Sequence, residues 1–120
     1  MKILICDDSK AMRMIVTRTL RQAGYGDAEL HEAEDGADGL EKVTLLAPDL
    51  VLSDWNMPNM TGIELLTALR SSGNEVRFGF ITSETTPEMR ERAIAGGASF
   101  MLAKPFTADD VQDALGAVVG

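Results

Sequence analysis

The chain has 120 residues, with 11 lysine and arginine residues against 19 aspartate and glutamate residues, and a net charge of -8. Hydrophobic residues make up 45% of it, which excludes an intrinsically disordered chain, and the acidic balance disfavours binding to nucleic acid or to an anionic membrane. A single cysteine, Cys6, cannot form an internal disulfide bond, and no apolar run approaches the roughly 20 residues that span a bilayer, so we expect a monomeric cytoplasmic protein.

Hydrophobic periodicity predicts five strands that alternate with five helices. Short apolar runs predict the strands, and longer stretches with apolar residues at helical spacing predict the helices. In chain order we expect a strand at 3–6, a helix at 11–23, a strand at 28–33, a helix at 37–47, a strand at 50–53, a helix at 63–70, a strand at 76–82, a helix at 87–96, a strand at 99–103 and a helix at 108–118. Their short connections predict an α/β fold, a doubly wound parallel sheet with helices on both faces.

Capping residues mark the ends of these helices. Ser9 is the expected N-cap of the first helix, and Gly24 is expected to end it. Thr107, with Asp110 three residues later, resembles a capping box that opens the last helix. Because no linker or low-complexity tract interrupts the pattern, we expect residues 1–120 to form a single domain, without a separate effector domain.

The first helix has a predicted apolar face. At helical spacing this face comprises Ala11, Met12, Ile15, Val16, Thr19, Leu20 and Ala23. Arg13 and the other basic residues of the stretch lie elsewhere on the helical wheel, so we expect them to point away from the core.

Polar side chains follow the predicted strands. Asp7 and Asp8 come after the first strand, Asp54 follows the third, Thr82 ends the fourth, and Lys104 follows the fifth. In doubly wound sheets ligands bind outside the carboxyl ends of the strands, so these side chains are candidates for one common site. An acidic first turn excludes a dinucleotide site, whose glycine-rich turn presents backbone amides to a pyrophosphate, and the sequence contains no P-loop.

Three carboxylates at one edge indicate a bound cation. Oxygen ligands suit Mg²⁺, and a single histidine with a single cysteine leaves no zinc site. The charges of Asp7, Asp8 and Asp54 balance those of Mg²⁺ and Lys104. A phosphoryl group on Asp54 would bring further negative charge, which the cation and Lys104 would stabilise.

Over its whole length the sequence resembles the response-regulator receiver domain, and it is most similar to the single-domain chemotaxis regulators of that family. The matching segments are Asp7–Asp8, Glu32–Gly36, Asp54–Met60, Gly62–Leu66, Thr82, Gly97–Ala98 and Lys104–Phe106. The resemblance implies a flavodoxin-like sheet with strand order 2-1-3-4-5. It also implies a phosphorylation-activated switch of a two-component system, in which Asp54 accepts a phosphoryl group from a histidine kinase or a small phosphodonor.

The resemblance implies a ligand set for the metal. Asp8 and Asp54 would bind Mg²⁺ directly, Asn56 would supply its backbone carbonyl, and Asp7 would act largely through a metal-bound water. These ligands all come from the segments that match the family.

Other roles implied by the resemblance concern the phosphoryl group. Lys104 would pair with its oxygens and Thr82 would hydrogen-bond one of them, drawing the loop that starts at Ser83 toward the site. Asn56 and Glu84 would flank the water that hydrolyses the group and so set its lifetime. The peptide bond between Lys104 and the following proline is usually cis in the family.

The sequence departs from the family pattern at Met101. Many members have an aromatic residue there that changes orientation on phosphorylation, and Phe100 cannot take its place because strand alternation sends it to the opposite face. We expect Met101, with its flexible side chain, to follow the loop after Thr82 by a rotamer shift.

The resemblance implies a signalling protein rather than an enzyme, catalysing only its own phosphorylation and dephosphorylation. Its expected partners are a histidine kinase, a phosphatase and an output partner such as a flagellar motor switch protein, which would bind the changed surface of the fourth helix, fifth strand and fifth helix. A phosphorelay intermediate or a regulator of a non-motility partner stays open. A small-molecule phosphatase is less favoured, because Asn56 stands where such enzymes carry a second acid and the chain has no room for a cap domain.

Overall fold

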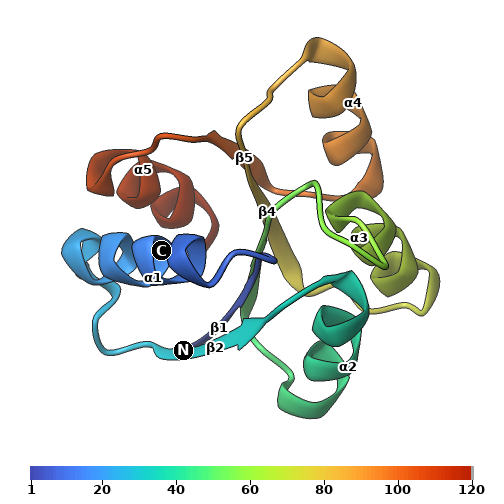
Figure 1. The fold of residues 1–120 in the computed structure, drawn as a ribbon, viewed down its shortest axis with the longest axis horizontal. Coiled ribbons are helices and arrows are strands. Elements are labelled where there is room, and N and C mark those ends of the chain that lie inside the picture. The colour runs from blue at the N-terminus through green and yellow to red at the C-terminus, as the bar shows by residue number, and fades with distance from the viewer. Residues whose placement is uncertain (120) are drawn as a thin grey trace.

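The computed structural model describes residues 1–119 and shows a central sheet with helices on both faces (Figure 1). The strands are β1 (Lys2–Cys6), β2 (Glu29–Ala33), β3 (Leu50–Ser53), β4 (Arg77–Thr82) and β5 (Phe100–Ala103). All neighbouring strands pair in parallel, in the order β2-β1-β3-β4-β5. The doubly wound sheet and its 2-1-3-4-5 order are therefore confirmed.

Two helices cover one face of the sheet and three cover the other. They are α1 (Lys10–Leu20), continued by the π-helical segment η1 (Arg21–Tyr25), then α2 (Gly36–Leu46), α3 (Gly62–Ser71), α4 (Pro87–Gly96) and α5 (Ala108–Val119). In Figure 1, α1 and α5 lie on one side of the sheet and α2, α3 and α4 on the other. Across the part of the chain that the structure describes, no helix combines the length and the apolar character that crossing a bilayer requires.

The helix ends follow the expected capping residues. The Ser9 side chain accepts a hydrogen bond from the Met12 amide at 3.1 Å, and Thr107 and Asp110 form a reciprocal capping box. The α-helical part of the first helix ends at Leu20, three residues before the predicted end, because the chain widens into η1. Gly24 has a φ of 100° inside η1, a left-handed conformation that ends the helical backbone there.

Strand side chains alternate between two cores. One core faces α2, α3 and α4 and includes Leu4, Cys6, Val51, Phe78 and Phe80. The other faces α1 and α5 and includes Ile3, Ile5, Leu50, Leu52 and Ile81. Because β1, β3 and β4 are buried on both faces, polar side chains that follow them are concentrated at the ends of the strands.

The buried face of α1 differs from the prediction. Arg13, expected to point away from the core, is 8% exposed, whereas Ile15, expected in the core, is 46% exposed. The guanidinium of Arg13 donates to the Asp7 carbonyl at 2.7 Å and pairs with Glu32 at 3.0 Å, so the end of β1 and a side chain of β2 supply the acceptors that its burial requires.

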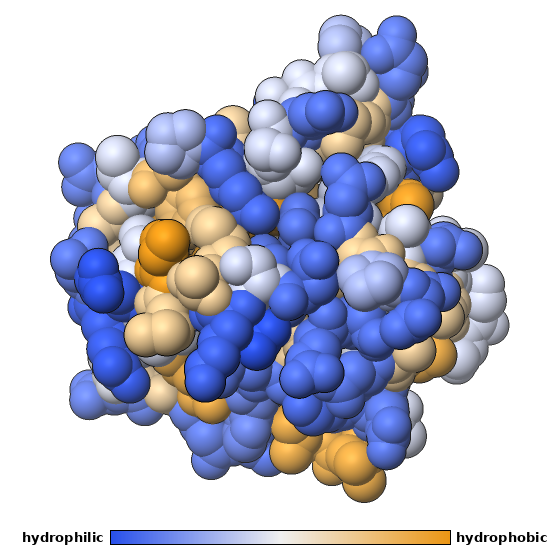
Figure 2. All heavy atoms as spheres, in the orientation of Figure 1, coloured by the Kyte–Doolittle hydropathy of each residue, from blue (hydrophilic) through white to orange (hydrophobic). Residues whose placement is uncertain are grey.

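Charged residues are unevenly distributed along the chain. Residues 9–26, which form α1, η1 and their flanks, contain four of the eleven basic residues and none of the nineteen acidic ones. Met14 and Ile15 are exposed among these basic residues. Figure 2 shows hydrophobic residues gathered over α1 and α5, with hydrophilic residues across the middle of the same face.

Arg70 joins the end of α3 to two loops. Its guanidinium donates to the carbonyls of Asn74 and Val76 at 2.8 Å each and of Gly97 at 2.9 Å. We expect Arg70→Met to lower the free energy of unfolding by about 2 kcal/mol, because three carbonyls lose a charged donor. Urea denaturation measures this, with the exposed Arg77→Met as the control; equal stability of the two variants would contradict the assignment.

Candidate functional site

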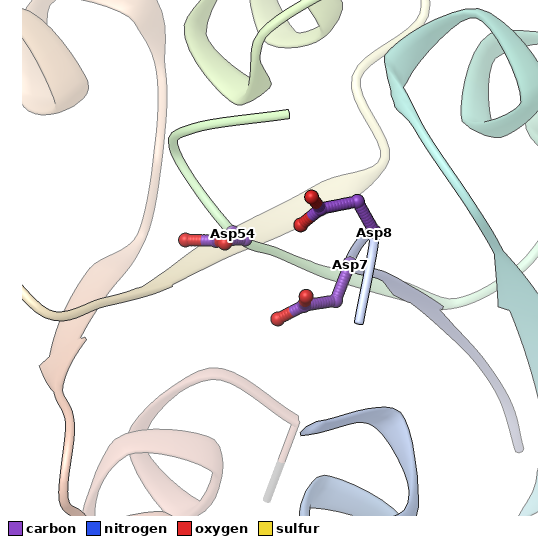
Figure 3. Close-up of side chains that lie close together, drawn as sticks. All are labelled: Asp7, Asp8 and Asp54. Carbon is purple, nitrogen blue, oxygen red and sulfur yellow. The ribbon is translucent and has the colours of Figure 1, made fainter. Parts of the chain in front are cut away.

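Three aspartate side chains meet at the carboxyl edge of the sheet (Figure 3). Asp7 and Asp8 follow β1, and Asp54 follows the neighbouring strand β3, whose end is tied to β1 by a 2.9 Å hydrogen bond from the Asp54 amide to the Cys6 carbonyl. One carboxylate oxygen from each aspartate lies within 4.8 Å of the other two. This all-oxygen group could hold a divalent cation of the hard type.

Lys104 supplies a positive charge to the cluster. Its ammonium nitrogen lies 3.3 Å from Asp7 Oδ2 and 3.5 Å from Asp54 Oδ2. Asp7 is 4% exposed and the Asp54 side chain 13% exposed, whereas Asp8 is open to solvent. One lysine thus faces a buried and a partly buried carboxylate with an exposed third beside them, and the group retains a net negative charge.

The Asp54 carboxyl is electrostatically strained. Burial raises its pKa above the ordinary value, and the Asp7 carboxylate raises it further. The Lys104 ammonium and the Trp55 amide, which donates to Asp54 Oδ1 at 2.8 Å, both act to lower that pKa. Because burial outweighs them, the ionised form of Asp54 is destabilised unless another cation joins the site.

Thr82 and Lys104 lie on neighbouring strand ends. The Lys104 amide donates to the Thr82 carbonyl at 2.8 Å, and the buried Thr82 hydroxyl accepts from the Glu84 amide at 3.4 Å. Glu84, Ser83 and Asn56 are exposed in the loops that follow β4 and β3. The Lys104–Pro105 peptide bond is cis, as expected.

The two residues at the start of β5 face opposite cores. Met101 packs against the core on the α2, α3 and α4 side, and Phe100 packs against the core on the α1 and α5 side. The predicted alternation is confirmed, so Phe100 does not occupy the position of an aromatic switch.

Two residues support the site in ways that were not predicted from the sequence. Besides Arg13, which holds the Asp7 backbone, Gly62 packs directly against the Asp54 carbonyl, where a Cβ atom would collide with it. The Gly62 amide also donates to the Trp55 carbonyl at 2.8 Å. The glycine at the start of the third helix was a visible signal for close packing, whereas nothing in the spacing of Arg13 indicated that it is buried.

Trp55 extends the site toward α4. Its ring is packed rather than at the rim, since the residue is 7% exposed and its ring centroid lies 4.8 Å from that of Phe80. The guanidinium carbon of Arg92, on α4, lies 5.5 Å from the Trp55 ring centroid, within the range of a cation–π contact.

Comparison with known proteins gives one consistent result. A model of the response regulator receiver domain matches residues 3–116. The chain is 37% identical over 121 residues to a probable chemotaxis protein CheY of Rhizobium etli, covering 99% of this chain and 92% of that protein. It is also 37% identical over 123 residues to the chemotaxis protein CheY1 of Helicobacter pylori, covering 100% and 98%.

Solved structures agree with these relatives. The chemotaxis protein CheY4 of Vibrio cholerae is 37% identical to the chain, with a TM-score of 0.86, and the match covers 98% of each. The similarity therefore extends over the whole fold and includes both strand ends that carry the aspartates.

Proposed function

This chain belongs to the response regulator receiver domain family, and from that premise we propose that it is a phosphorylation-activated switch of a two-component system acting in chemotaxis, with residues 1–120 as a single receiver domain. The observation that carries the proposal is the position of the Asp54 carboxylate, which lies with two further aspartates and within 3.5 Å of the Lys104 ammonium. Three relatives that span nearly the whole chain are named as chemotaxis proteins, which supports that pathway over a phosphorelay.

Asp54 is the proposed nucleophile of the phosphoryl transfer. One of its carboxylate oxygens attacks the phosphorus of a kinase phosphohistidine or of a small acyl phosphate. The new bond is an oxygen–phosphorus bond, the donor's bond to phosphorus breaks, and its electron pair leaves on the donor nitrogen or oxygen. Lys104 stabilises the charge that moves to the phosphoryl oxygens, and the hydroxyl of Thr82 hydrogen-bonds one of them.

We propose Mg²⁺ as the resident cation. Asp8 and Asp54 would bind it directly, Asp7 through a water, and Asn56 through its backbone carbonyl. When bound, Mg²⁺ neutralises the acidic cluster and the charge of the phosphoryl oxygens. The all-carboxylate donor set supports this choice of metal.

The output surface is proposed to be formed by α4, β5 and α5. A cavity of about 290 Å³ lies between α4 and β5, with Ala93, Ile94 and Met101 in its lining. Thr82 and Ser83 lead from the site into the loop before α4, so a movement of that loop toward a phosphoryl group would alter this cavity. The proposed partners are a histidine kinase, a phosphatase and a flagellar motor switch protein that binds the altered surface.

Acetyl phosphate tests the proposed function directly. With Mg²⁺, the protein is expected to gain the mass of one phosphoryl group, and the fluorescence of Trp55, its only tryptophan, is expected to change. Beryllofluoride should give the same fluorescence change without a covalent bond. An unchanged intact mass, with acetyl phosphate and Mg²⁺ both in excess, would overturn the proposal.

Mg²⁺ is expected to stabilise the fold. At ten times its dissociation constant it should add about 1.4 kcal/mol to the free energy of unfolding, which raises the unfolding temperature by about 5 °C. The physical reason is the unbalanced charge of Asp7, Asp8 and Asp54 in the metal-free site. Thermal unfolding in MgCl₂ measures the effect against NaCl of equal ionic strength, and identical midpoints in the two salts would exclude a metal site here.

The lifetime of the phosphoryl group is expected to depend on Asn56 and Glu84. Both are exposed in the loops at this edge, where they can flank an attacking water. We expect Asn56→Arg or Glu84→Leu to slow hydrolysis about tenfold, the effect of raising the barrier by about 1.4 kcal/mol. Phosphate release from the labelled protein measures the rate, Glu88→Leu in the first turn of α4 is the control, and decay as fast as in the parent would remove both residues from this role.

A further inference from the structure

An exposed arginine covers the ring next to the proposed phospho-acceptor. The Arg92 guanidinium carbon lies 5.5 Å from the centroid of the Trp55 ring, whose other contacts include Phe80 at a centroid distance of 4.8 Å. The Trp55 ring is thus held between a strand of the sheet and a side chain of α4. A guanidinium over an indole is attracted by the ring's electron density, most strongly where water is excluded.

Helix α4 has few other attachments. Ala93 is the only fully buried residue among its ten described residues, and Met89 is partly buried against the same core. Ile94, one turn from Arg90, is 68% exposed. Because so little apolar surface anchors α4, a single side-chain contact is a substantial part of what holds it against the sheet.

Trp55 is also bonded directly to Asp54. Its amide donates to Asp54 Oδ1 at 2.8 Å, and its carbonyl accepts from the Gly62 amide at 2.8 Å. A phosphoryl group on Asp54 would change the charge and position of the carboxyl oxygens that this amide meets. The Trp55 backbone therefore lies between the carboxylate and the contact with Arg92.

We infer that Arg92 is a positioning residue that couples the state of Asp54 to α4 through the ring of Trp55. In the unphosphorylated protein the contact holds α4 against the sheet, and phosphorylation weakens it and releases α4. The second half of this inference rests on the proposed function, and the first half does not. The contact between Arg92 and Trp55 would also connect Asp54 to α4 in a chain that has methionine, not an aromatic residue, at position 101.

Hydrogen exchange without phosphodonor or metal tests the first half. We expect Arg92→Met to raise the exchange of the α4 amides about two- to fivefold, the loss of one exposed cation–π contact, and Arg92→Lys to restore part of the protection. Arg90→Met, on the same helix, is the matched control. Equal exchange in Arg92→Met and Arg90→Met would overturn the inference.

Beryllofluoride with Mg²⁺ tests the coupling. In the parent, hydrogen exchange of the α4 amides should rise when beryllofluoride binds. In Arg92→Met this rise should be smaller, because the contact with Trp55 is already absent. A full rise in Arg92→Met, with loss of the rise in Met101→Ala, would instead assign the coupling to Met101. Failure of the parent's Trp55 fluorescence to respond at all would contradict the proposed function, and the metal-free exchange data would stand independently of it.

Discussion

The variant Asp54→Asn is expected to take up no phosphoryl group from acetyl phosphate and Mg²⁺ under conditions that label the parent fully. An amide oxygen lacks the negative charge of the attacking carboxylate, and it is also a weaker ligand for a hard cation. Intact mass after incubation measures the uptake. The exposed Asp27→Asn is the control, and it should be labelled like the parent; labelling of Asp54→Asn to the same extent would assign the acceptor elsewhere.

The same variant also tests how stability depends on pH, because the pKa of Asp54 is raised in the folded protein. A carboxyl whose pKa is higher in the folded state binds more protons there, so its contribution to stability is lost as pH rises through the folded-state pKa. Without metal, Asp54→Asn should therefore be more stable than the parent at neutral pH. The difference should disappear below the ordinary pKa of an aspartate, and Mg²⁺ should reduce it by stabilising the parent more than the variant.

Lys104→Met is expected to slow phosphoryl transfer to Asp54 by about 10²–10³-fold, the usual effect of removing a preorganised group from developing charge. The ammonium lies 3.5 Å from Asp54 Oδ2 and 3.3 Å from Asp7 Oδ2. Mg²⁺ should nevertheless bind more tightly to the variant, because the three carboxylates lose the lysine that opposes their charge. The initial rate with acetyl phosphate and an Mg²⁺ titration followed by Trp55 fluorescence measure the two effects.

These opposite changes separate a direct role of Lys104 from simple damage to the site. A variant that had lost its fold would bind Mg²⁺ more weakly as well as react slowly. Lys10→Met, at the first residue of α1, removes an exposed positive charge and should leave the rate within a factor of two or so. A Lys104→Met rate close to that of Lys10→Met would eliminate the lysine from the transfer step.

Much of the site could be predicted from the sequence, because the topology of the sheet places its side chains at the ends of the strands. Asp7 and Asp54 stand directly after buried strands and Lys104 after the edge strand β5, and the carboxyl ends of parallel strands meet at one edge. Short apolar runs and capping residues are local signals, so the ends of the strands could be predicted to within a residue or two.

The contacts across helices could not be predicted in this way. A helical wheel assigns Arg13 to a polar face, yet its guanidinium finds the Asp7 carbonyl and Glu32 and is buried there. Ile15 is displaced to solvent because α1 buries only a narrow stripe. Both outcomes depend on how α1 tilts on the sheet, and periodicity carries no information about that tilt.

The environment of Trp55 likewise could not be predicted from the sequence. Its ring packs against Phe80, which lies 25 positions later in β4, and against Arg92, which lies 37 positions later in α4. The long-range pair is therefore a product of the tertiary fold.

The charges of this acidic molecule are unevenly placed, since residues 9–26 carry four basic side chains and no acidic one, whereas three aspartates gather at the carboxyl edge of the sheet. A hollow lined by Met12, Ile15, Lys104, Pro105 and Phe106 lies between α1 and this edge. A negatively charged phosphodonor would be repelled by the net negative charge of the three aspartates at this edge, so a cation bound there would speed the encounter as well as the transfer. Because added salt shortens the reach of this repulsion to about 8 Å at physiological ionic strength, salt would speed the encounter with the metal-free site more than it changes the chemistry that follows.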